Sequence, residues 1–325
     1  VLLHDPLGKA PTPRIEPQLQ GTSHDTDAAP RSMPLTPEVT SAAAADTVKL
    51  PDVPGFDPLI DFIAGIDAAE PISGAGLAEL HTRVGAAGKR LRIVGYNTVS
   101  SQWEDAPRLS GGRYAHLRIA VQLLDRKGVV DVDTLSAIAQ AVRECAADFG
   151  ASASSPNVDA AVMAARELDN ECSEIDISIG MNVAPPSGAT FAGTRIRASA
   201  EKVGFKLEPN GVFHYRDSAR RTLFTLVNQE PAPFLAEQIK QLNTSGVTLL
   251  LDVPRVSDGH TALELMLRTG RMLAGDLGGT LVDDNCAPLN DNSVRAIDQQ
   301  LATIHARMQA RGIPAGGERA LRLFS

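Results

Sequence analysis

The sequence predicts an α+β protein, in which helices cover one face of an antiparallel sheet in an RRM or ferredoxin-like manner. Three observations predict it. Short segments alternate apolar and polar residues with a period of two, as half-buried strands do. Longer segments place apolar residues at spacings of three and four, as amphipathic helices do. The same order of strands and helices then returns in the second half, which predicts two related domains in tandem.

Length and composition agree with two folded domains. The chain has 325 residues, 43% of them hydrophobic, so its core is large enough to need no disulfides. The net charge of -8 arises in the first half, because residues 174–325 carry equal numbers of basic and acidic side chains. Neither half has the basic surface that neutralises phosphates, so nucleic acid is not an expected partner.

Composition also predicts the domain boundaries. Residues 1–54 carry nine prolines and show no hydrophobic period, which predicts a disordered Pro-rich linker. Residues 55–171 are expected to form a divergent first domain and residues 172–312 the second. Residues 313–325 are expected to be a flexible tail.

The first domain is predicted from six periodic segments. Asp133 and Thr134 offer a helix cap, and Gly150 stops the helix that follows. The expected strands are 59–66, 91–96 and 117–124, and the expected helices are 76–84, 135–149 and 158–168.

The second domain repeats this order with additional segments. Gly278 and Gly279 suit the left-handed cap that ends its longest helix. The expected strands are 177–183, 205–207, 212–215, 223–228, 247–253 and 280–282. The expected helices are 190–203, 234–242, 261–277 and 292–308.

No residue pattern predicts catalysis, a metal or a cofactor. Cys145, Cys172 and Cys286 are an odd, scattered set, which argues against a disulfide framework and against a zinc site. No two of the seven histidines lie four residues apart, as a helical metal site would require. We therefore expect a binding protein rather than an enzyme.

Alternation assigns the two faces of the second sheet. One face is predicted to form the core with the helices: Ile179, Met181, Phe213, Phe224, Leu226, Leu249, Leu251 and Val253. This register turns the strand aromatics inward, whereas RNA-binding sheets expose theirs, which argues against RNA binding. The opposite face is predicted to be open, with an apolar stripe of Val212, Val227 and Leu250 beside the small residues Ser178 and Gly180.

Four runs carry a family resemblance: MNVA at 181–184, VFHY at 212–215, GVTLLLDVP at 246–254 and GDLGGTLVDD at 275–284. With them, the second domain resembles the FtsZ-binding domain family of the bacterial division protein ZipA. The resemblance implies a non-enzymatic adaptor that holds the C-terminal tail of FtsZ on its open sheet face. It also implies a single-pass anchor in the cell inner membrane with the domain in the cytoplasm. The membrane helix would precede this chain, which is itself expected to be soluble.

Position in the family and the register of the open face together predict the tail-binding residues. They are Ser178, Gly180, Asn210, Val212, Thr225, Val227, Gln229 and Leu250. An alternative stays open from the tandem arrangement: a regulatory module that binds a small molecule between its two domains. Polar groups converging at the domain interface would favour that alternative.

Overall fold

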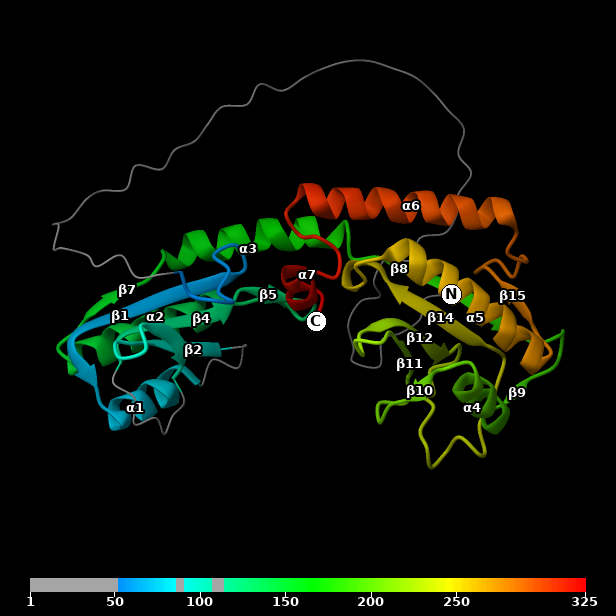
Figure 1. Cartoon of the computed structure of the whole chain (residues 1–325), viewed down its shortest axis with the longest axis horizontal. Helices are drawn as coiled ribbons and strands as arrows, with labels where there is room; N and C mark the ends of the chain where they lie inside the picture. The colour runs from blue at the N-terminus through cyan, green and yellow to red at the C-terminus, as the bar shows by residue number, and fades with distance from the viewer. Residues whose placement is uncertain (1–51, 86–90, 107–113) are drawn as a thin grey trace, which may run out of the picture.

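The structure is a computed structural model that describes residues 52–85, 91–106 and 114–325. The predicted linker, residues 1–54, lies almost entirely outside the described residues. The described part is a mixed α+β protein with two large antiparallel sheets placed side by side, each carrying its own helices (Figure 1). None of the described helices combines the length and the apolar character that crossing a bilayer requires.

The first domain is built on a five-stranded sheet in the order β3-β2-β4-β1-β7. Its main strands are β1 (Asp61–Ile72), β2 (Leu91–Asn97), β3 (Gln102–Asp105), β4 (Tyr114–Gln122) and β7 (Ser152–Ser154). A small hairpin pairs β5 (Leu124–Asp125) with β6 (Gly128–Val129). The helices are α1 (Gly74–Gly85), α2 (Val132–Asp148) and α3 (Val158–Ser173).

The second domain is built on a six-stranded sheet in the order β10-β11-β12-β14-β8-β15. The strands are β8 (Ser178–Ala184), β10 (Lys206–Leu207), β11 (Phe213–Arg216), β12 (Thr222–Asn228), β14 (Val247–Asp252) and β15 (Thr280–Val282). Outside the sheet, β9 (Phe191–Ala192) pairs with β13 (Asn243–Thr244). The helices are α4 (Gly193–Lys202), α5 (Gly259–Leu277) and α6 (Asp291–Ala310), with a short 3₁₀ turn, η1 (Val253–Arg255), after β14.

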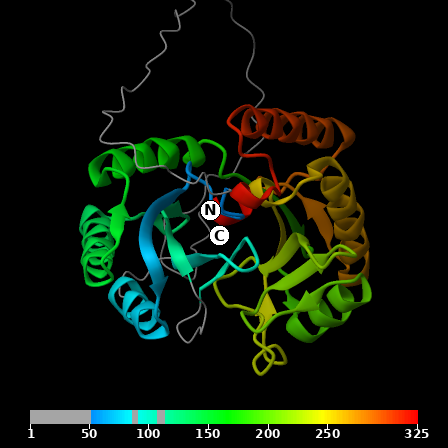
Figure 2. The ribbon, with the colours of Figure 1, turned by 60° about the vertical axis from the view of Figure 1, so that its left-hand side comes forward.

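Four helices lie on the outer sides of the two sheets, α1 and α2 on the first and α4 and α5 on the second, at the left and right of Figure 2. Both sheets contain four strands in corresponding order: β7-β1-β4-β2 in the first and β15-β8-β14-β12 in the second. Each sheet thus packs one face on its helices and turns the other face toward the middle of the molecule.

The predicted core of the second domain is confirmed. All eight residues assigned to the inner face are buried, with Leu249 and Leu251 fully so. The helix caps follow the expected chemistry, since Gly278 ends α5 in the left-handed conformation at φ 69°. The predicted cap of α2 is wrong by two residues, because Asp131 accepts the hydrogen bond from the Thr134 backbone N–H.

Two predicted segments of the second domain differ in the structure. Residues 234–242 form turns rather than a helix. Phe234 packs against Phe213 with ring centroids 5.3 Å apart, and its backbone N–H bonds to Gly211, while Leu242 accepts from Gly193. Contacts with other segments thus hold both ends of residues 234–242. The helix predicted from residue 190 begins at Gly193 instead, because β9 precedes it.

The predicted flexible tail is also wrong. The chain ends in a helix, α7 (Glu318–Leu323), and Ala320, Leu323 and Phe324 are at most 2% exposed. Arg322 pairs with Asp61, whose side chain is 1% exposed, and Arg319 Nε lies 2.6 Å from an Asp57 carboxylate oxygen. The C-terminal helix therefore docks on the first domain, on residues that lie 261 and 262 positions earlier in the chain.

Candidate functional site

The candidate site is the open face of the second sheet, and its register is as predicted. Along β14, Leu250 is half-buried between Leu249 and Leu251, which are fully buried. Leu250 stands opposite Thr225 on one side and Gly180 on the other. These three predicted residues are therefore direct cross-strand neighbours, with side chains on one face.

The row through Leu250 continues outward across the sheet. Thr225 stands opposite His214, which stands opposite Lys206. His214 Nδ1 lies 3.2 Å from the hydroxyl of Thr222. Burial, with a smaller effect from the nearby Arg216, lowers the pKa of His214 below its ordinary value of 6.5. At neutral pH the row is thus uncharged from His214 to Gly180, with Leu250 as its largest apolar side chain.

One end of the open face is held by the first domain. Ser178 stands opposite Asp252, and Arg126 from the turn between β5 and β6 reaches across to that carboxylate at 2.7 Å. The same guanidinium binds Asp176 at 2.5 Å, and its carbon lies 5.6 Å from the centre of the Phe324 ring. Burial opposes the charge on Arg126, but the hydrogen bonds that its guanidinium donates to both carboxylates outweigh this effect and raise the pKa of Arg126.

The other end of the open face is closed by the loop after β15. Asn182 and Thr248 point to the open side yet are buried, and the Thr248 hydroxyl donates to the Asn182 amide oxygen at 2.7 Å. The Asn182 amide nitrogen in turn donates to an Asp284 carboxylate oxygen at 2.9 Å. The part of the open face that a ligand could reach is therefore shorter than the strands themselves.

The remaining predicted residues lie along the margin of this face. Val227 is half-buried and stands opposite Thr248. Asn210 is exposed in a turn and accepts a hydrogen bond from the Val212 backbone N–H at 3.2 Å. The Gln229 backbone N–H donates to the Gly246 carbonyl at 3.2 Å, which places Gln229 just beyond the last paired residues of β12.

Sequence reasoning missed three features of the site. It did not include His214 or Asp252 among the binding residues, although they follow Val212 and Leu250 by two residues and alternation therefore puts them on the same open face. It could not have found Arg126, which comes from the first domain, 126 residues before Asp252. The burial of Asn182 depends on the loop after β15, which carries no strand or helix signal.

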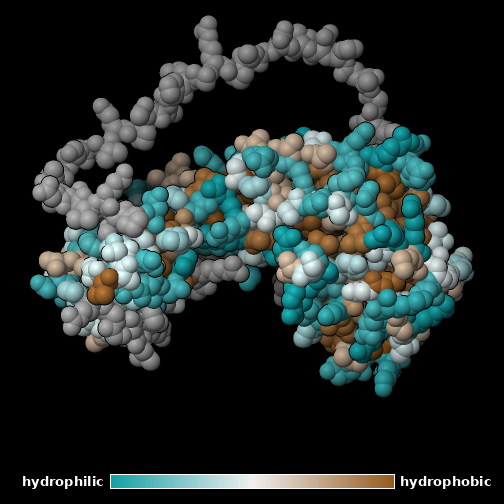
Figure 3. Space-filling view, in the orientation of Figure 1, coloured by the Kyte–Doolittle hydropathy of each residue, from teal (hydrophilic) through white to brown (hydrophobic). Residues whose placement is uncertain are grey.

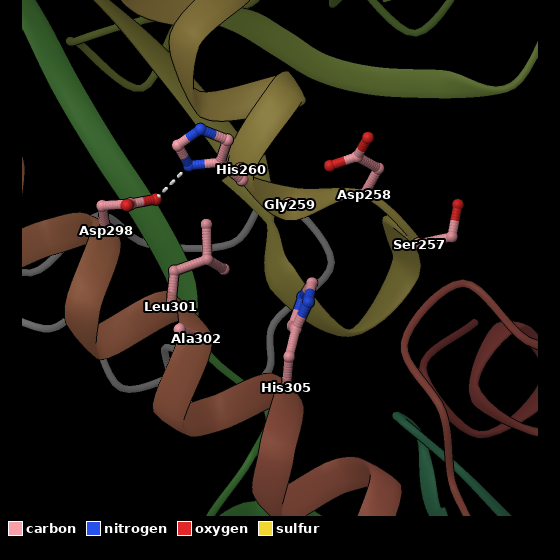
Figure 4. Close-up of a pocket in the computed structure, with 8 residues that line it drawn as sticks. All are labelled: Ser257, Asp258, Gly259, His260, Asp298, Leu301, Ala302 and His305. Atoms are coloured by element: carbon pink, nitrogen blue, oxygen red, sulfur yellow. Dashed lines mark hydrogen bonds and ion pairs between the residues drawn. The ribbon is translucent and has the colours of Figure 1, made fainter.

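Two surface pockets lie away from the open face. One, of about 390 Å³, lies between the start of α5 and the side of α6, where His260 Nδ1 bonds to Asp298 at 2.7 Å (Figure 4). The hydrogen bond to Asp298 raises the pKa of His260. Among the described residues, no three His, Cys, Asp or Glu side chains come together as a metal site would require.

The second pocket, of about 350 Å³, lies on the first sheet beside α7. Asp61, Arg92 and Arg322 line it, together with the Gly55 and Phe56 segment.

Elsewhere on the surface, the view of Figure 3 shows apolar residues gathering around α5 and α6. Met272 on α5 is a large apolar side chain that is 53% exposed on this helix.

Comparison with known proteins gives a match to the second domain. Residues 177–300 match a family model described as "ZipA, C-terminal FtsZ-binding domain". A curated relative, the Cell division protein ZipA of Glaesserella parasuis serovar 5 (strain SH0165), is 30% identical over 118 residues. That alignment covers 35% of this chain and 43% of the relative, so the chain spans less than half of that protein's length.

The resemblance read from the sequence is thus confirmed for the second domain. The matched stretch begins one residue before β8 and ends within α6, so it includes the whole second sheet. Residues 55–171, which the sequence predicts to be a first domain, lie outside the matched stretch.

Proposed function

We propose that this chain is part of a non-enzymatic bacterial cell-division adaptor whose second domain binds the C-terminal tail of FtsZ. The binding surface is the open face of the second sheet. An N-terminal membrane helix, outside this chain, would tether the FtsZ ring to the inner membrane. The observation that carries the proposal is the family match over residues 177–300, which includes every residue predicted to contact the tail.

The geometry of the open face supports a short amphipathic peptide as the ligand. Leu250 offers a central apolar contact, and Gly180 beside it has no side chain. Thr225 completes a row without formal charge. Burial of apolar side chains in such a surface is how amphipathic peptides are commonly held.

The strand orders support a further part of the proposal. The two sheets share four corresponding strands, which can be numbered by their order in the chain. In each sheet the first of the four lies between the third and the fourth, as in ferredoxin-like domains. We infer two related domains that diverged at the far edge of the sheet, where the first domain adds β3 and the second adds β10 and β11.

The alternative, a small molecule held between the domains, has less support. The polar groups that meet at the interface bind one another, since Arg126 bonds directly to both Asp176 and Asp252. A ligand at this point would have to displace these ion pairs.

The test is a calorimetric titration of the chain with a synthetic peptide of the FtsZ C-terminal tail. Leu250→Asp should weaken binding by at least about 1 kcal/mol, the loss expected when a central contact is removed. Met272→Asp, an exposed change on the helix side, is the matched control and should bind like the unaltered chain. If Leu250→Asp lowers the unfolding temperature, Thr225→Glu in the same row replaces it. Absence of binding heat with the unaltered chain would contradict the proposal.

A further inference from the structure

The open face of the first sheet carries a row of aromatic side chains. Tyr96 stands opposite Trp103 on one side and His116 on the other. We call these three residues the aromatic row. Each is half-buried, and the row ends at Asp67, which stands opposite His116. Because the residues are cross-strand partners, their side chains share one face.

The rings of the aromatic row stand at steep angles to one another. Tyr96 and Trp103 have centroids 5.4 Å apart and planes at 67°, and Tyr96 and His116 have centroids 6.4 Å apart and planes at 63°. Val94, two residues before Tyr96 and on the same face, is 1% exposed. Edge-to-face packing of this kind stabilises the rings against one another, so the row presents a fixed aromatic surface.

Polar groups fix the row from one side. Asp67 accepts hydrogen bonds from His116 at 2.8 Å and from Arg118 at 2.9 Å. The Arg118 guanidinium carbon also lies 5.6 Å from the centre of the Trp103 ring. The row is thus held in place before any ligand arrives, which lowers the ordering cost of binding.

We propose that the aromatic row is a docking site for residues 31–37 of this same chain. That stretch reads Arg-Ser-Met-Pro-Leu-Thr-Pro and contains prolines at 34 and 37. Segments with the P-x-x-P spacing bind aromatic-lined surfaces as an extended polyproline helix, at little entropic cost. The site goes beyond FtsZ binding and does not depend on it.

The connection between the two sites has a suitable length. The chain enters the first domain beside the open face, where Arg92 Nη1 bonds to the Pro54 carbonyl at 3.1 Å and the guanidinium carbon lies 5.6 Å from the Phe56 ring. Tyr96 follows Arg92 by four residues on the same strand, a distance of about 13 Å at the strand rise. The sixteen residues between Pro37 and Pro54 would have a mean span of about 22 Å as a flexible chain.

A tether of this length gives a high local concentration of the ligand. When the mean span is comparable to the distance to be bridged, the effective concentration is on the order of 1 mM. Even a weak interaction would then be made within one molecule. Arg31 adds charge complementarity, because the Asp105 side chain on the same face is 73% exposed although it pairs with Arg92.

The test uses the single tryptophan of the sequence, Trp103, as a local probe. In the full chain, Pro34→Ala with Pro37→Ala should increase the quenching of Trp103 fluorescence by acrylamide. The matched control, Pro11→Ala with Pro13→Ala, should quench like the unaltered chain. Equal quenching in all three chains would overturn the proposal. Protection that disappears on dilution would also overturn it, because the ligand would then be a second copy.

A second measurement supplies the proposed ligand segment as a separate peptide. A synthetic peptide of residues 28–40, added to the Pro34→Ala, Pro37→Ala chain, should restore the protection of Trp103 with a Kd below about 1 mM, the effective concentration of the tether. Tyr96→Ala added to that chain should raise the Kd of the peptide by at least about fivefold, as loss of a central aromatic contact does. A Kd far above that limit, or no effect of Tyr96→Ala, would contradict the site.

Discussion

The two open sheet faces have corresponding strands and are occupied differently. On the first face, the pair Asp61 and Gln122 at one end is covered by α7 through Arg322. On the second face, Asp252 at the corresponding end is held by Arg126 from the first domain. One sheet is thus capped by the chain's own C-terminus and the other by its neighbour domain. The open face of a sheet can thus hold another part of the same chain as well as a binding partner.

The middle rows of the two faces differ in charge. On the first face, Arg92 stands opposite Ala120, which stands opposite Ile63. On the second, the corresponding row is Thr225, Leu250 and Gly180, which carries no formal charge. An apolar peptide would leave the Arg92 guanidinium partly desolvated on the first face, which is unfavourable. This difference favours the second face for the FtsZ tail.

The largest expected effect comes from removing Arg322. Arg322→Ala leaves the Asp61 carboxylate, 1% exposed, without its cation and should destabilise the chain by about 3 kcal/mol. The Asp57 backbone N–H still donates to Asp61 at 2.9 Å, which keeps the loss at the low end of the usual range. Chemical denaturation measures it. Arg307→Ala, on the exposed side of α6, is the control and should change stability by less than about 0.5 kcal/mol.

The corresponding change on the second face is expected to be smaller. Arg126→Met removes the ion pairs with Asp176 and Asp252, which remain partly exposed, and should cost about 2 kcal/mol. Arg143→Met on α2, where the side chain bonds only to the exposed Gln140 in the contacts described, should be close to neutral. If Arg126→Met is as neutral as its control, the first domain does not support the end of the second face.

The salt dependence of FtsZ-tail binding should be weak. Residues 174–325 are formally neutral, and exposed charges are screened beyond about 8 Å at physiological ionic strength. Affinity should therefore change only a few-fold between low and moderate salt, with a negative heat-capacity change from apolar burial. A steep loss with salt would instead assign recognition to Arg216, Arg220 and Arg221, near the turn that follows β11.

The smallest effect concerns His214. Its pKa lies below 6.5 because of burial, and a bound peptide should bury it further and lower the pKa again. Tail affinity should thus be constant above about pH 6.5 and should fall as the pH drops through the pKa of His214. An NMR titration of the ring measures the shift, with His260 as the unaffected control. An increase in the His214 pKa on binding would place the peptide elsewhere.

Local patterns predicted most of the elements and the register of the second sheet. Alternation along β8, β12 and β14 separated Leu250 from Leu249 and Leu251, because a side chain can face only one of the two sides of a strand. The boundaries of β15 were also correct, since Gly278 and Gly279 fix where α5 ends.

Contacts between distant segments could not be predicted in this way. The helix α7 is six residues long and is stabilised by the first domain rather than by its own periodicity. The turns at 234–242 arise because Phe234 packs on Phe213 in another strand. The same holds for Arg126, whose role depends on how the two domains meet.

The proposal that the second face binds the FtsZ tail can be tested by NMR, with the tail peptide mapped onto both faces. Binding to the second face should shift the methyl signals of Leu250, Val227 and Val212, with no shift for Ile63 or Val94 on the first face. Shifts confined to the first face, or spread over the exposed Met272 side of α5, would contradict it.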